Sequence, residues 1–159
     1  IGRHVLARHV ALEAAGYRLS QEDFGEAVAA AYAAAGLRAE VVAFEPDMPN
    51  RYRWADLALC RSGALTVAEL ALAGLPALLV PYPFAADDHQ TANAAALVAA
   101  GAARMLDQNP LGGERVVNAL RKVFEAPEQL AAMGDSAAKL ARPDAAAQIV
   151  EDCATRMGR

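Results

Sequence analysis

The most informative part of the sequence reads Asp56-Leu-Ala-Leu-Cys-Arg-Ser-Gly-Ala-Leu-Thr-Val-Ala-Glu69. Its first five residues are nearly all apolar, as expected for a parallel β-strand that is covered on both faces. Two small residues, Ser62 and Gly63, then precede a segment with helical character. A strand that turns directly into a helix is the unit from which α/β sheets are built, so this stretch predicts an α/β fold.

The same alternation of strand and helix continues on both sides of this stretch. Gly36 and Gly74 suit the left-handed position after a helix end, and Pro76 prevents the preceding helix from continuing. Helices are expected at residues 23–35, 46–54, 65–73, 90–100, 113–125, 127–141 and 144–157. Strands are expected at residues 40–44, 56–60, 77–80 and 104–106. The chain is therefore predicted to form a Rossmann-like parallel sheet with flanking helices.

Composition narrows the class of function. The 159 residues have the length of one domain, and a net charge of −4 gives no general attraction for a phosphate backbone, so nucleic acid is not an expected partner. Cys60 and Cys153 form no metal-ligand spacing, which favours a reducing compartment and predicts no metal site. No apolar stretch reaches the roughly twenty residues that span a bilayer. Because the first residue is Ile1, we expect the chain to be part of something longer.

The amino-terminal segment, residues 1–22, is left unassigned, and residues 23–159 are taken as the folded domain. Two arginines and two histidines lie in the first half of this segment, at Arg3, His4, Arg8 and His9. They could mark a ligand or phosphate site. We favour the simpler interpretation, in which they lie on an ordinary solvated helix face.

Ser62 and Gly63 indicate where a ligand could bind, because both allow the backbone to come close to it. Ligands of open α/β sheets bind at the carboxyl ends of strands, and the first turn of the following helix presents unpaired N–H groups and partial positive charge. Both features favour a phosphate group. A small residue at such a position is more often only part of a turn, so physical grounds alone favour the simpler interpretation.

Glu69 strengthens the case for a ligand. Thr66 and Glu69 are three residues apart and therefore share one face near the start of the helix. A carboxylate there can accept two hydroxyl hydrogen bonds, as the acidic residue of dinucleotide-binding folds does with ribose. The alternative is that Glu69 only complements the positive end of the helix dipole.

A second polar cluster follows the expected strand at residues 77–80 and again leads into a helix. It reads Asp87-Asp-His-Gln-Thr-Ala-Asn93. Either Asp87 or Asp88 can cap that helix. Neutral donors and acceptors of the kind that bind sugar hydroxyls are supplied by His89, Gln90 and Asn93. A single histidine is more often a surface residue, but this one lies beside an amide and opposite the candidate phosphate turn.

The order and spacing of these motifs resemble the carboxy-terminal signature of the MurG family of bacterial glycosyltransferases. The resemblance covers about residues 23–157. The segments that carry it are Ala55-Asp56, Cys60–Glu69, Ala73–Ala77, Val80-Pro81, Asp87–Gln90 and Asn93. The segment Phe44–Met48 also resembles the part of the family that meets a uracil ring.

This resemblance implies half of a GT-B glycosyltransferase, in which two Rossmann-like domains face a cleft and the carboxy-terminal one holds UDP-N-acetylglucosamine. It implies that the main chain at Phe44 and Glu45 meets uracil, with Met48 close by. It also implies that Glu69 meets the ribose, and that the diphosphate lies beside Ala64, Leu65 and Thr66 with Arg61 as a further donor. The implied site residues are Phe44, Glu45, Met48, Arg61, Ser62, Gly63, Ala64, Leu65, Thr66, Glu69, Asp88, His89, Gln90 and Asn93, of which His89 and Gln90 face the sugar.

Enzymes of this family transfer N-acetylglucosamine to a lipid-linked muramyl-pentapeptide by inverting transfer, as part of peptidoglycan and cell-wall synthesis. The resemblance implies no metal and no cofactor, and a peripheral place on the cytoplasmic face of the bacterial membrane. Residues 1–22 show neither the family's Gly-Gly-Ser-type loop nor its His-Gln-x-Gly-like turn. The acceptor domain, which carries the general base, is also absent, so we expect no catalytic group in this chain. Two alternatives stay open: a donor-binding subunit of another GT-B lipid glycosyltransferase, or a non-catalytic nucleotide-sugar-binding fragment.

Overall fold

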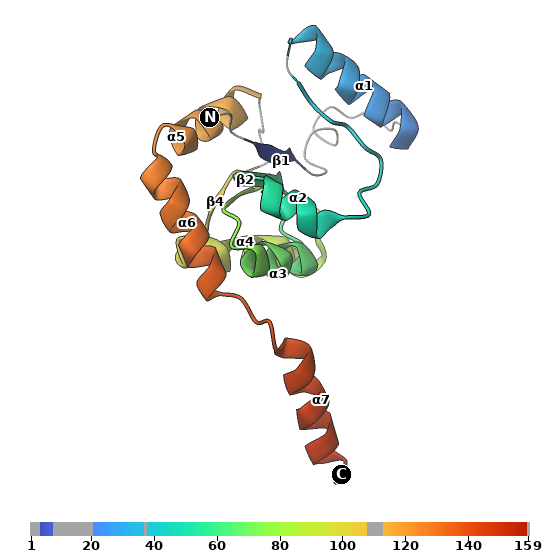
Figure 1. The fold of residues 1–159 in the computed structure, drawn as a ribbon, viewed down its shortest axis with the longest axis vertical. Coiled ribbons are helices and arrows are strands. Elements are labelled where there is room, and N and C mark those ends of the chain that lie inside the picture. The colour runs from blue at the N-terminus through green and yellow to red at the C-terminus, as the bar shows by residue number, and fades with distance from the viewer. Residues whose placement is uncertain (1–3, 8–20, 37, 108–112, 159) are drawn as a thin grey trace.

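A four-stranded parallel sheet forms the centre of the protein (Figure 1). The computed structural model describes residues 4–7, 21–36, 38–107 and 113–158. The strands are β1 (Val5–Ala7), β2 (Leu57–Cys60), β3 (Ala77–Leu79) and β4 (Ala103–Met105), in the order β1-β2-β3-β4. In register, Leu59 lies between Ala7 and Leu78, and Leu78 pairs with Arg104. The predicted parallel sheet is confirmed, and the carboxyl ends of all four strands lie at one edge.

Each expected helix is present within a few residues of its predicted bounds. The helices are α1 (Gln21–Ala34), α2 (Met48–Trp54), α3 (Ala64–Ala73), α4 (His89–Ala99), α5 (Gly113–Phe124), α6 (Pro127–Lys139) and α7 (Ala145–Arg156), with a short 3₁₀ helix η2 at Ala86–Asp88. No helix among the described residues is long and apolar enough to cross a membrane.

The two faces of the sheet differ in side-chain size. Alternate residues of a strand point to opposite faces. One face presents mainly small side chains to a core shared with α2, α3 and α4, namely Ala58, Cys60, Ala77, Leu79 and Ala103. The other presents larger ones to α5 and α6, namely Leu57, Leu59, Leu78 and Val80. Small side chains allow α3 and α4 to approach the sheet closely, which brings their first turns near the carboxyl ends of β2 and β3.

Two glycines explain how α6 packs against the end of α3. Gly74 ends α3 with φ of +61°, a left-handed conformation that suits glycine. A Cβ atom on Gly134 of α6 would lie 2.9 Å from the carbonyl oxygen of Gly74. Because that distance is shorter than any ordinary contact, the two backbones can meet only if residue 134 has no side chain.

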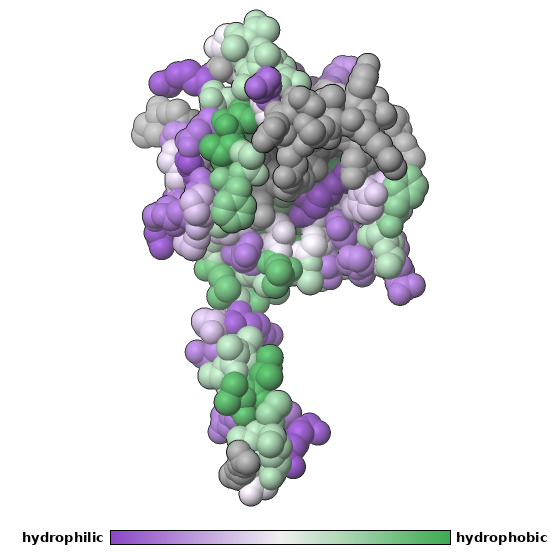
Figure 2. All heavy atoms as spheres, turned by 90° about the vertical axis from the view of Figure 1, so that its right-hand side faces the viewer, coloured by the Kyte–Doolittle hydropathy of each residue, from purple (hydrophilic) through white to green (hydrophobic). Residues whose placement is uncertain are grey.

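The first and last helices stand apart from this centre (Figure 1). No side chain of α7 is buried, and Figure 2 shows apolar side chains gathered along it. The exposed large hydrophobic residues of this part of the chain are Ile149, Val150 and Met157. None of the side chains described between Gly25 and Gly36 is buried.

Two expectations about the first fifty residues are wrong. The residues around His4 do not lie on a helix, because Val5–Ala7 form β1, and the His4 amide donates to Asp56 Oδ2 at 2.8 Å. The strand expected at 40–44 is absent, and this segment is irregular. The physical reason is the same for both: a short apolar run carries too little periodicity to distinguish strand from helix or loop. Arg3, Arg8 and His9 lie outside the described residues.

Candidate functional site

Ser62 joins the two strand-end turns that the sequence predicts to bind a ligand. Its side chain is completely buried. The hydroxyl donates to the main-chain carbonyl of Gln90 at 2.8 Å, and the Ser62 amide donates to Gln90 Oε1 at 3.3 Å. The Ser62 carbonyl accepts from Asn93 Nδ2 at 3.0 Å. All three polar groups of Ser62 are thus bonded to the start of α4, which fixes the β2–α3 turn against the β3–α4 turn.

Gln90 has an orientation that follows from these bonds. Its Oε1 also accepts the amide of Tyr82 at 3.0 Å, so one oxygen receives two main-chain N–H groups. The Nε2 group has no hydrogen-bond partner among the described residues. The acceptor of this side chain therefore holds the two turns together, and its Nε2 donor is the group that remains for a ligand.

Arg61 brings a positive charge to the same edge of the sheet. Its Nη1 donates to the carbonyls of Val80 at 3.2 Å and Pro81 at 3.1 Å. The guanidinium lies 5.3 Å from the centre of the Tyr82 ring, a cation–π contact, and Phe84 meets Tyr82 edge-on at 5.7 Å. These contacts hold Arg61 over the beginning of the loop that leads from β3 to α4.

The first turn of α3 is open to a ligand. Gly63 precedes the helix without a side-chain cap, and the N–H groups of Ala64, Leu65 and Thr66 lie too early in the helix for an intrahelical partner. Leu65 is 80% exposed. A Cβ atom on Gly63 would meet only Thr66 Oγ1, at 3.9 Å, and its φ of −62° suits any residue. Neither packing nor conformation requires a glycine here, and a glycine at this position leaves the first turn of the helix uncovered.

The start of α4 is strained and is not capped as expected. Asp87 and Asp88 have φ of 51° and 50°, a region that residues other than glycine adopt at some energetic cost. Asp88 occupies the position before the helix, but its side chain makes no capping bond, so the expected aspartate cap is wrong. The left-handed backbone of Asp88 is the reason, since side-chain caps ordinarily have an extended backbone.

His89 has a defined tautomer when it is neutral. Its Nδ1 lies 2.7 Å from the carbonyl oxygen of Ala86. A carbonyl can only accept, so Nδ1 carries the proton, and Nε2 of the neutral ring is an acceptor. His89 and Gln90 therefore present complementary groups at the start of α4: an acceptor from the ring and a donor from the amide.

Glu69 is connected to α2. The Tyr52 hydroxyl donates to Glu69 Oε2 at 2.6 Å. Tyr52 lies on the buried face of α2 and is 7% exposed, whereas Glu69 is exposed on α3. Thr66 is half-buried one turn before Glu69, so the two polar side chains share the helix face that the sequence predicts.

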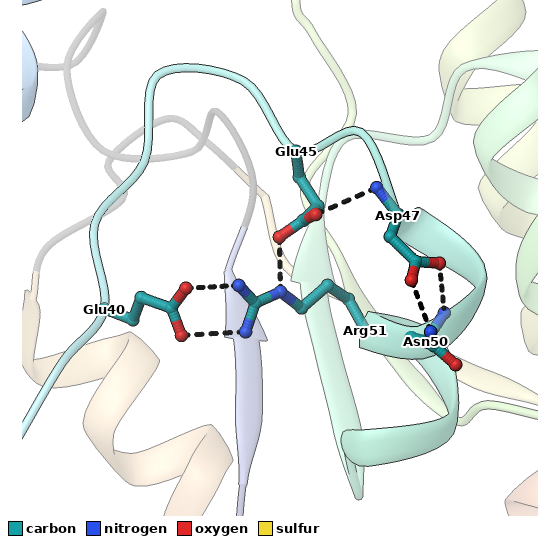
Figure 3. A network of polar contacts seen from close by, with 5 residues as sticks. All are labelled: Glu40, Glu45, Asp47, Asn50 and Arg51. Atoms are coloured by element: carbon teal, nitrogen blue, oxygen red, sulfur yellow. Dashed lines mark hydrogen bonds and ion pairs between the residues drawn. The ribbon is translucent and has the colours of Figure 1, made fainter.

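The loop before α2 is held by charged side chains (Figure 3). Arg51 contacts Glu40 through both terminal nitrogens and Glu45 through Nε. The Asp47 amide donates to Glu45 Oε1 at 2.9 Å, and this bond, followed by Arg51, lowers the pKa of Glu45. The hydrogen bond from Arg51 likewise lowers the pKa of Glu40. Phe44, which precedes Glu45 in the sequence, is 81% exposed, and Met48 packs against the core.

The structure thus brings predicted site residues at the ends of β2 and β3 into direct contact, namely Ser62, Gln90 and Asn93. The predicted residues Phe44 and Glu45 lie in the loop before α2, residues 38–47. Sequence reasoning did not single out three residues that hold the site: Arg51, Tyr52 and Tyr82. One signal was available for Tyr52, because it lies four residues after Met48 on the same helix face, and a buried tyrosine hydroxyl needs a partner. Within the part of the chain that the structure describes, no three His, Cys, Asp or Glu residues are grouped to hold a metal ion.

Comparisons with known proteins identify the family of this chain. Residues 14–149 match the glycosyltransferase family 28 C-terminal domain. A UDP-N-acetylglucosamine–N-acetylmuramyl-(pentapeptide) pyrophosphoryl-undecaprenol N-acetylglucosamine transferase of Stutzerimonas stutzeri is 52% identical over 122 residues, which cover 77% of this chain and 34% of that protein. The enzyme of the same name from Chromohalobacter salexigens is 53% identical over 77% of this chain and 33% of its own length. The chain therefore spans about a third of the length of these relatives.

Solved structures show the same fold. The crystal structure of Acinetobacter baumannii MurG matches with a TM-score of 0.79 and 35% identity, over 93% of this chain and 48% of that one. The glycotransferase of kitacinnamycin matches with a TM-score of 0.60 and 19% identity, over 95% of this chain and 43% of that one, and supports the fold alone. The predicted GT-B half is confirmed, and this chain belongs to glycosyltransferase family 28 as its carboxy-terminal domain.

Proposed function

We propose that this chain is the donor-binding domain of an enzyme that transfers N-acetylglucosamine from UDP-N-acetylglucosamine to a lipid-linked muramyl-pentapeptide, forming lipid II for peptidoglycan. One observation carries the proposal: the buried bonds of Ser62 hold the open first turn of α3 beside the start of α4, at the carboxyl edge of the sheet. Relatives about 50% identical are named for this transfer. Acceptor binding and the general base are assigned to the remainder of the whole enzyme.

The geometry suggests how the donor binds. The diphosphate meets the N–H groups of Ala64, Leu65 and Thr66, and the fixed charge of Arg61 lies nearby. Glu69 accepts the ribose hydroxyls, and the sugar faces His89 and Gln90. Fixed donors stabilise charge as it develops on the departing UDP, because they need no rearrangement during the reaction.

We propose further that the complete enzyme works on the cytoplasmic face of the membrane as a peripheral protein. The support is chemical: the relatives' acceptor is named as an undecaprenol-linked pyrophosphate, a lipid, whereas the donor is a soluble nucleotide. The donor site must therefore open to water while the acceptor site meets the lipid surface.

Removing the Glu69 carboxylate tests donor binding. Hydrogen bonds to a charged group contribute about 1.5–3 kcal/mol, so Glu69→Ala should weaken UDP binding roughly ten- to over a hundredfold in calorimetry. Glu151→Ala removes an exposed carboxylate of α7 and should leave binding unchanged. If Glu69→Ala binds UDP as tightly as the unaltered protein, Glu69 only complements the helix dipole.

Gln90 allows the sugar-binding role to be separated from the scaffold role. Gln90→Glu keeps an oxygen for the amides of Ser62 and Tyr82 but removes the Nε2 donor. In the complete enzyme, the ratio of kcat/KM for UDP-N-acetylglucosamine over its C4 epimer should fall roughly tenfold. The added charge repels the diphosphate of both donors equally, so the ratio isolates the sugar. An unchanged ratio would remove Gln90 from sugar recognition.

A further inference from the structure

Tyr52 combines a buried ring with an exposed partner. The ring packs in the core with Leu70 of α3 and is 7% exposed, so its position is set by packing. Its hydroxyl donates to the carboxylate of Glu69, which is exposed on α3, at 2.6 Å. A buried tyrosine hydroxyl usually finds a partner in the core or the backbone. Here the partner is the carboxylate that the proposed function assigns to the ribose.

The helix that carries Tyr52, α2, also holds the loop at Phe44 and Glu45, which the resemblance assigns to the uracil ring. Asp47 caps α2 by accepting the Asn50 amide at 3.3 Å, and Arg51 contacts Glu45 of the loop. Arg51 and Tyr52 are adjacent in sequence, but they contact different partners: Glu45 of the loop and Glu69 of α3. The helix therefore connects the loop at Phe44 with the carboxylate on α3.

We propose that Tyr52 is a positioning residue for nucleoside recognition, which holds the Glu69 carboxylate in one orientation for the ribose hydroxyls. The proposal rests on the proposed donor-binding function. A carboxylate can accept about four hydrogen bonds, so accepting from Tyr52 is compatible with accepting from ribose hydroxyls as well. A glutamate side chain that is already oriented loses less conformational freedom when the ligand binds.

The hydroxyl can be removed without removing the ring. Tyr52→Phe in the complete enzyme keeps the ring that packs in the core and removes the hydroxyl that donates to Glu69. Calorimetry with UDP should show affinity reduced roughly three- to tenfold, the ordinary effect of having to order one side chain on binding. The second probe is 2′,3′-dideoxy-UDP, which lacks both ribose hydroxyls, and its affinity should change little. The preference for UDP over the dideoxy probe therefore falls.

Two controls isolate the proposed bond. Tyr32→Phe removes a tyrosine hydroxyl from the exposed helix α1 and should leave both affinities unchanged. In a protein that already carries Glu69→Ala, adding Tyr52→Phe should weaken UDP binding no further, because the carboxylate that Tyr52 holds is gone.

The outcomes separate this inference from the proposed function. If the unaltered enzyme binds neither probe, both proposals are overturned. If it binds UDP and the dideoxy probe equally, the ribose roles of Glu69 and Tyr52 are overturned while donor binding stands. If it prefers UDP and Tyr52→Phe keeps the full preference, the role of Tyr52 is overturned while donor binding stands. A variant that weakens both probes by the same factor also overturns it, since a purely structural role would act on both alike.

Discussion

The strand-end turns and the 38–47 loop both belong to the candidate site, but they are held by different forces. The turns are fixed by hydrogen bonds between Ser62, Gln90 and Asn93, with Ser62 completely buried. The loop is fixed by charged side chains around Arg51, of which Glu40 is exposed to water. A buried hydrogen-bonded network is costly to break, whereas exposed ion pairs contribute little and weaken with salt.

This difference suits the two ligand parts that we assign to them. Charge on a departing diphosphate is stabilised best by donors that do not move, and the turns provide those. A uracil ring that is held by main-chain groups needs only a loop of the right shape, and surface charges can maintain that shape. We therefore expect changes in the turns to affect folding or binding strongly, and changes in the loop to act mildly.

Gln90→Leu should give the largest effect on stability. It leaves the amides of Ser62 and Tyr82 without their acceptor, and an unsatisfied buried donor costs about 1–3 kcal/mol. Because the two bonds are only partly buried, we expect the free energy of unfolding to fall by about 2–3 kcal/mol in urea denaturation. In Gln90→Glu, which keeps the acceptor, the free energy of unfolding should fall much less. Equal losses in the two variants would mean that Oε1 does not hold the turns together.

The sequence also predicts the strand-end turns better than it predicts the 38–47 loop. The strands β2 and β3 are apolar throughout, which predicts strands covered on both faces, and the structure buries both. The strand expected at 40–44 is absent, because a short apolar run does not establish that a partner strand is available. Alternation along a chain indicates an element, but not which neighbour is available to pair with it.

The contacts within the site were less predictable than its location. The pattern around Glu69 indicated a ligand position, but the bond from Tyr52 joins residues 17 apart on different helices. The second donor to Gln90 Oε1 comes from Tyr82, a residue without a polar motif around it. Such contacts depend on how α2, α3 and α4 pack together. The spacing of residues along one helix does not predict that packing.

Gly63→Ala should separate binding from folding at the α3 turn. The added methyl group meets only Thr66 in the protein, so the free energy of unfolding should change by less than about 1 kcal/mol. A ligand seated against this turn would be overpacked by about 1–3 kcal/mol, so UDP affinity should fall roughly tenfold in calorimetry. An unchanged affinity would place the diphosphate away from Gly63.

Arg51→Met should have a smaller effect, and mainly on binding. It releases Glu40 and Glu45 from their shared partner. Glu40 is 62% exposed and Glu45 only 15% exposed, so we expect the change in thermal unfolding to be small and to come mainly from Glu45. UDP affinity should fall roughly two- to fivefold at low salt, because the loop must then be ordered on binding. The difference in UDP affinity between this variant and the unaltered protein should become smaller at high salt. Arg53→Met, on the same helix but without an ion pair to the loop, is the matched control.

The smallest effect concerns pH. The pKa values of Glu40 and Glu45 are lowered in the folded protein, so the stabilisation from their charged forms is complete above the ordinary value of 4.5 and is lost as pH falls through the lowered values. The Asp47 amide reports this directly, because it donates to Glu45 Oε1. Its resonance in amide NMR spectra should move with a midpoint below 4.5, and Arg51→Met should raise that midpoint only partly, since the Asp47 bond is the larger cause of the shift. Arg53→Met should leave the midpoint where it is. A midpoint at or above 4.5 in the unaltered protein would mean that charge does not hold this loop, and the contrast with the strand-end turns would then need another explanation.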